Sequence, residues 1–150
     1  MGALLEIISS EEKRPQLVDD CVSLVDSEVE SKKGLSGKMV KMGYKAFVSI
    51  KPGIVKRAVD FLLDDFAGVL DGYHEEYLGE QPERKTPFST WVLSREKRIA
   101  EDLLEITDGI IDQSDKKVIK KIYSGLRGVA AKHVAEAVPN VGRLVEKHAG

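Results

Sequence analysis

The sequence predicts an all-α protein, a bundle of about seven to nine helices in a single domain spanning residues 1–150. Apolar residues recur every three or four positions through most of the chain, which is the period of a buried helix face. Apolar and polar residues nowhere alternate for long enough to predict a strand. Hydrophobic residues make up 42% and charged residues 32% of the 150 residues, so the chain can bury a core without disulfides.

The first half of the chain predicts three consecutive helices. Pro15 suits the first turn of a helix, where its missing N–H is not needed, and Gly34 ends that helix after two lysines. Ser36 is a suitable N-cap for a second helix of about 12 residues. The Lys-Pro-Gly sequence at 51–53 ends the second helix and precedes the third. Within the third helix, the acidic pair at 64–65 predicts a kink or a new start.

The second half follows a linker at residues 79–87, which contain glycine, two prolines, glutamine and mixed charges. A short aromatic helix is expected at 88–92. Longer helices are expected to begin at Ser94 and Ser114, and Pro139 is expected to open a last helix because proline suits the first turn.

The two halves resemble each other, which predicts an internal repeat. Residues 17–31 align with residues 99–113, and two further helices match in the same order when short loops are dropped. Repeat one covers about 15–78 and repeat two about 95–148, related by a pseudo-twofold axis. Chance similarity between amphipathic helices is the alternative explanation. The aligned pairs include Asp20 with Asp102, Asp26 with Asp108, and Tyr44 with Tyr123.

Charged residues occur in blocks of one sign. Residues 32–57 hold eight bases and no acids, and residues 58–83 hold eight acids and no bases. The second half repeats the alternation, with six acids in 99–115 and six bases in 116–132. The net charge of −2 gives no overall case for nucleic acid or an anionic membrane. Helices of opposite sign are therefore expected to lie side by side.

The basic helices are also the candidate binding face, for nucleic acid or a phosphate ligand. Its candidate residues are Lys38, Lys41, Lys45, Lys117, Lys120 and Lys121. A second candidate is the aromatic pair Phe88 and Trp91. This pair is expected to fill a gap between the halves, and the alternative is an anchor for a partner protein.

No motif for a cofactor, a metal or catalysis is expected. Residues 34–38 resemble a phosphate loop only in composition, because two residues separate the glycines and no hydroxyl follows the lysine. The histidines at 74, 133 and 148 have no second His, and no Cys, at the spacing of metal ligands. The single cysteine, Cys21, lies on an apolar stripe and is expected to pack as a small hydrophobic residue.

Three sequence motifs and the end of the chain resemble a known family. The motifs are Arg14-Pro15-x-Leu17-Val18, Lys33-Gly34-Leu35-Ser36-Gly37 and Lys51-Pro52-Gly53-Ile54-Val55, with Val134 and Pro139 near the end. They resemble a family of small all-helical bacterial proteins of unknown function, familiar mainly from actinobacteria. The resemblance implies an α-helical fold and no assigned activity, so it transfers no functional residue.

The sequence favours a non-enzymatic interaction or scaffold protein with an unknown protein partner or with itself, as in a homodimer. Nucleic-acid or phosphate binding through the lysines is the first alternative. A ligand or enzyme pocket between the repeats, near Tyr44 and Tyr123, is the second. We expect a cytoplasmic protein that does not enter a membrane, because no apolar stretch approaches the length of a membrane span.

Overall fold

The computed structural model describes residues 2–149, and every regular element in that range is a helix, which confirms the all-α class. A four-residue helix, α5 (Phe88–Trp91), and a 3₁₀ turn, η1 (Val92–Arg95), lie in the middle of the chain. The described residues form six longer helices: α1 (Ala3–Ile8), α2 (Arg14–Ser31), α3 (Gly34–Val48), α4 (Ile54–Glu80), α6 (Glu96–Asp112) and α7 (Lys117–Ala149).

The predicted number of helices was too high, because two predicted breaks lie inside continuous helices. One of them is in α4, which runs without interruption through Asp64 and Asp65. Both carboxylates are exposed there, whereas Leu63 and Ala67 are buried on the other side of the helix. The adjacent acids therefore face water, and the helical period continues past them.

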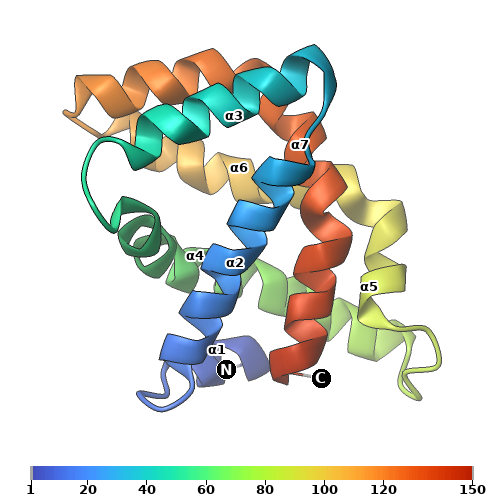
Figure 1. The fold of residues 1–150 in the computed structure, drawn as a ribbon. Helices are drawn as coiled ribbons and strands as arrows, with labels where there is room; N and C mark the ends of the chain where they lie inside the picture. Colours follow the sequence, from blue (N-terminus) through green and yellow to red (C-terminus); the bar gives the residue numbers. More distant parts are fainter. Residues whose placement is uncertain (1, 150) are drawn as a thin grey trace.

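The second continuous helix is α7, which passes through Pro139, where a new helix was expected. Proline inside a helix cannot donate to the carbonyl four residues earlier, here that of Ala135, and its ring presses against that carbonyl and bends the helix. Figure 1 shows α7 changing direction between its orange first half and its red second half. Burial of Val138, Gly142 and Val145 keeps the second half against the core and offsets the lost hydrogen bond.

Helix boundaries around the predicted linker differ by a few residues. α4 continues to Glu80, two residues into segment 79–87. The short aromatic helix is present at Phe88–Trp91. The 3₁₀ turn η1 then takes the residues before α6, which begins at Glu96 and not at Ser94.

The sequence did not predict α1, which is short but well anchored. Leu4, Ile7 and Ile8 are buried, and α1 packs on α4 and α7. The carboxylate of Asp71, in α4, accepts hydrogen bonds from the backbone N–H groups of Leu4 (2.9 Å) and Leu5 (3.0 Å). The first N–H groups of a helix have no partner within the helix, so a distant aspartate here satisfies them.

The helices form two crossed layers with a cap at each end (Figure 1). α2 and the second half of α7 lie on one face, and α4 and α6 lie behind them. α3 packs beside the first half of α7 at one end, and α1 lies at the other. The most deeply buried large side chains, Val92, Ile99 and Val138, come from η1, α6 and α7 and mark the centre of the core.

An aromatic cluster fixes α5 to the side of this core. The ring of Phe88 lies 5.8 Å from that of Trp91 and 5.2 Å from that of Tyr77, and His74 meets the edge of Phe88 at 5.3 Å. The guanidinium of Arg95 sits 3.7 Å from the centre of the Trp91 ring, in cation–π geometry. Phe88 and Trp91 are both buried, so their rings pack inside the molecule.

Replacing Ile99 tests the position of the core. Ile99 is 0% exposed, so Ile99→Ala is expected to lower the free energy of unfolding by about 2–5 kcal/mol through lost burial and a new cavity. Val118→Ala is the matched control, because Val118 is 60% exposed and its loss is expected to change stability by about 0.5 kcal/mol or less. Urea unfolding followed by circular dichroism measures both, and equal effects would contradict this core.

Candidate interaction surface

α3 and the first half of α7 lie antiparallel and in close contact. Ser36, near the start of α3, contacts the Nε2 atom of His133 at 3.1 Å, far along α7. Gly43 lies about two helical turns after Ser36 and faces Leu126, which lies about two turns before His133 in α7. A Cβ atom at Gly43 would lie only 2.6 Å from the Cδ1 atom of Leu126. A larger residue at position 43 would therefore require the Leu126 side chain to shift.

We call α3 together with residues 117–132 of α7 the basic layer. The six lysines proposed from the sequence are all exposed on it. Neither segment contains an acidic residue. Among the residues that the structure describes, no carboxylate oxygen lies within ion-pair distance of any of these six ammonium groups. Both lysine groups are therefore exposed on adjacent helices, with no carboxylate partner among the described residues.

Apolar side chains lie among these lysines. Leu35 is 82% exposed, Met42 72% and Val118 60%. Met39, which the helical period placed on the buried side of α3, is exposed as well. The sequence analysis did not single out Leu35, Met42 or Val118 as part of a binding surface. Large apolar side chains in water beside unpaired cations are typical of a binding surface.

The inner side of the basic layer is held by acids from α2 and α6. The Tyr44 hydroxyl donates a hydrogen bond to the Asp26 carboxylate, and the Tyr123 hydroxyl donates to Asp108 at 2.5 Å. Arg127 adds a forked contact to Asp108, with its Nε atom 2.9 Å from the carboxylate. Partial burial, with Asp26 next to it, raises the pKa of Tyr44 to about 12, so the hydroxyl remains a donor.

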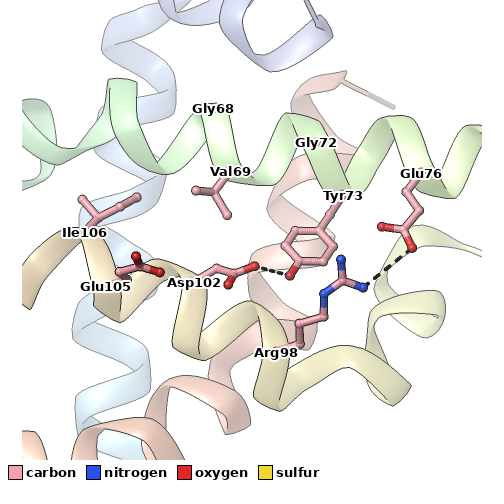
Figure 2. A pocket seen from close by; sticks show the side chains of 9 residues that line it. All are labelled: Gly68, Val69, Gly72, Tyr73, Glu76, Arg98, Asp102, Glu105 and Ile106. Atoms are coloured by element: carbon pink, nitrogen blue, oxygen red, sulfur yellow. Dashed lines mark hydrogen bonds and ion pairs between the residues drawn. The ribbon is translucent and has the colours of Figure 1, made fainter.

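A groove lies between α4 and α6, on the face shown in Figure 2, with α2 and α7 behind it. The Tyr73 hydroxyl donates to the Asp102 carboxylate across it, and Arg98 stacks over the Tyr73 ring at 5.1 Å. Arg98 also lies 3.8 Å from Glu76. We call this the acidic groove; it encloses about 700 Å³ and is lined by Gly68, Val69, Gly72, Tyr73, Glu76, Arg98, Asp102, Glu105 and Ile106.

A second groove lies between α2 and the second half of α7. It encloses about 450 Å³, and Asp20 of α2 lines it together with Lys147 of α7. Asp20 accepts contacts from Lys147 at 2.8 Å and from the Nε2 atom of His148 at 2.7 Å. Tyr44 and Tyr123 line neither of these grooves, and their hydroxyls bind carboxylates. Neither groove is therefore the pocket that the sequence predicted near these two tyrosines.

The remaining sequence candidates lie in the packed interior. Burial raises the pKa of the Cys21 thiol to about 11, so the thiolate needed for nucleophilic chemistry is scarce at neutral pH. Burial lowers the pKa of both His74 and His133, which keeps these rings neutral. In residues 2–149 no three His, Cys, Asp or Glu side chains are grouped closely enough to hold a metal ion. No helix in that range is long and apolar enough to cross a membrane.

Comparison with known proteins places the chain in one family and offers no further relative. A family model described as a family of unknown function (DUF6918) matches residues 4–149, nearly the whole chain. Neither a curated protein nor a solved structure matches the chain.

The acid that holds the inner side of the basic layer gives a pH-dependent test. Hydrogen bonds from Arg127 and then Tyr123 lower the pKa of Asp108, so this carboxylate stabilises the fold above its unfolded pKa of about 3.9 and loses that contribution as the pH falls below it. Asp108→Asn is expected to lower the free energy of unfolding by about 1 kcal/mol at neutral pH, a value reduced for a side chain 39% exposed.

Unfolding by urea from pH 7 to pH 3 checks this expectation. The difference between the wild type and Asp108→Asn should shrink as the pH falls below about 4. Asp112→Asn, on the same helix and exposed, is the control and should behave like the wild type. A difference that stays constant with pH would show that the Asp108 charge does not contribute.

Proposed function

We propose that this chain, which belongs to the family of unknown function DUF6918, is a non-enzymatic interaction protein that binds an acidic protein partner through the basic layer. The observation that carries the proposal is the set of six exposed lysines with no carboxylate partner among the described residues. Elsewhere in the molecule several basic residues are paired with acids of the same chain: Arg14 binds Asp60 and Asp64, and Lys32 binds Glu28.

The apolar side chains of the basic layer favour a protein over a nucleic acid. Leu35, Met42 and Val118 project among the lysines, and methionine adapts to varied apolar partners. A partner with carboxylates around a few apolar side chains would match both components. Surfaces that bind single-stranded nucleic acid instead carry exposed aromatic rings for base stacking, and the rings of Phe88 and Trp91 are buried.

Nucleic-acid or phosphate binding through the same lysines is the second candidate function. It is supported by the charge of the basic layer alone. It requires binding that weakens steeply with salt, because each neutralised phosphate releases counterions. A protein partner that also contacts Leu35 and Met42 would retain part of its affinity at high salt, and this difference separates the two candidates.

The two halves are, on this proposal, diverged copies of one helical unit related by a pseudo-twofold axis. Three observations support this. Tyr44 bonds Asp26 just as Tyr123 bonds Asp108, and both pairs occupy aligned positions. The aligned acids Asp20 and Asp102 each reach the last helix of the other half. The α2–α7 groove then corresponds to the acidic groove, on the opposite face.

Equivalent roles for the two tyrosines can be tested by removing each hydroxyl. Tyr44→Phe and Tyr123→Phe should each lower the free energy of unfolding by about 0.5–1.5 kcal/mol, the usual value of one such hydrogen bond. Thermal unfolding of both variants measures the two effects. A loss confined to one position would contradict equivalent roles.

Photo-cross-linking in the native host tests the proposed binding surface. A photoreactive phenylalanine analogue at Met42, inside the basic layer, should give a discrete protein adduct. The same analogue at Leu93, which is exposed outside the layer, is the matched control and should give none. Lys38→Glu with Lys41→Glu should abolish the Met42 adduct, because the partner is acidic.

Two outcomes would contradict the proposal. An adduct removed by nuclease would establish the nucleic-acid alternative. Equal adducts at Met42 and Leu93, or an adduct that persists after the charge reversal, would show that the basic layer is not the binding surface.

A further inference from the structure

We propose that the partner of the basic layer is a second copy of this chain, and that the layer docks into that copy's acidic groove, between α4 and α6. This inference rests on the proposed function, because it uses the same surface and names what the surface binds. The contact joins two different surfaces of the same molecule, so it is heterologous, or head-to-tail.

The two surfaces are complementary in charge. Three acids and one base line the acidic groove, and the stretch of α4 that borders it belongs to a block of eight acids without a base. Glu105 is exposed in the groove, and no described cation lies within ion-pair distance of it. Figure 2 shows its carboxylate beside that of Asp102. Among the described residues, the groove thus offers one carboxylate without a partner, that of Glu105, in an acidic surrounding, and the basic layer offers unpaired lysines.

The groove also has room for the side chains of an incoming helix. Gly68 and Gly72 lie one turn apart on α4, and a Cβ atom at either position would meet nothing within 4 Å. Val69 of α4 and Ile106 of α6 add apolar side chains to the lining of the groove (Figure 2). The bare backbone lets another helix come close, as small residues do in packed helix pairs.

Exposed apolar residues of α3 also match an exposed apolar residue of α4 and the apolar lining of the groove. Phe61 is 65% exposed on α4 and lies two turns before Gly68 on the same side of the helix. The stretch from Phe61 to Glu76 spans about 22 Å, and α3, with 15 residues, also spans about 22 Å. Laid along this line, α3 would bring Leu35 and Met42 to Phe61 and the apolar lining of the groove.

Docking within one molecule is prevented by the fold, because the basic layer caps one end and the acidic groove opens on the face away from α2 (Figures 1 and 2). A single helix in a groove buries a small area, so the contact is expected to be weak and sensitive to salt. The net charge of −2 is small enough that two copies repel each other little.

Sedimentation of the purified full chain tests the proposal directly. The weight-average mass should rise with concentration up to about 500 µM in low salt and return to the monomer mass in high salt. Two variants should each weaken self-association at least tenfold. Lys38→Glu with Lys41→Glu removes the basic surface, and Gly72→Phe fills the groove.

Matched variants outside both surfaces control for unrelated effects. Lys97→Glu reverses an exposed charge beyond the basic layer. Gly79→Phe adds the same ring at another α4 glycine with open space around it. Both should associate like the wild type, and circular dichroism of every variant should retain the helical signal.

Mixing the two defective variants gives the decisive result. Each retains the surface that the other lacks, so an equimolar mixture should form a 1:1 complex although neither variant associates alone. A mixture that remains monomeric would overturn the head-to-tail contact. A wild type that remains monomeric at every concentration in low salt would overturn self-docking.

The outcome also separates this inference from the proposed function. If the wild type is monomeric but Met42 still gives a charge-dependent adduct with another protein, the basic layer binds a different acidic partner and only the self-docking fails. If Met42 gives no adduct and the wild type is monomeric, both proposals fail. An adduct of purified protein that joins Met42 to residues 61–76 would support both.

Discussion

The continuity of α7 is the constraint on which the rest of the fold depends. This 33-residue helix contacts α1, α2, α3, α5, η1 and α6, so most of the core is assembled against it. Its bend near Pro139 lets one helix serve two directions: the first half lies along α3, and the second half passes between α2 and α5. A straight helix of the same length could not lie along α3 and also pass between α2 and α5.

The distribution of charge follows from that arrangement. Asp26 of α2 and Asp108 of α6 face the basic layer, where tyrosine hydroxyls and Arg127 satisfy them. The lysines of α3 and early α7 lie on the outer side, too far from those acids to pair. Helices of opposite sign are adjacent, as the sequence suggested, but two tyrosine hydroxyls and Arg127, rather than the six lysines, make the contact with the acids. The exposed charge is therefore available for binding.

The helical period was enough to predict the class and most helix boundaries, because apolar residues at that spacing must face a core. It could not predict continuity at Pro139 or at Asp64, since burial of Val138 and Leu63 decides whether a local break is overridden. It missed α1, whose capping group, Asp71, lies far away in the sequence. The lysines could be identified from the sequence, because a side chain's charge does not depend on the fold. Their lack of ion-pair partners and the exposure of the methionines depend on how the helices pack.

The cap that Asp71 provides has a consequence for how the chain is made. Leu4 precedes Asp71 by 67 residues, so a ribosome must synthesise much of α4 before α1 can acquire its acceptor. A six-residue helix is too short to persist alone in water. The N-terminal apolar segment therefore stays exposed to solvent while the middle of the protein is synthesised. Its exposure during translation ends only when α4 folds back onto α1.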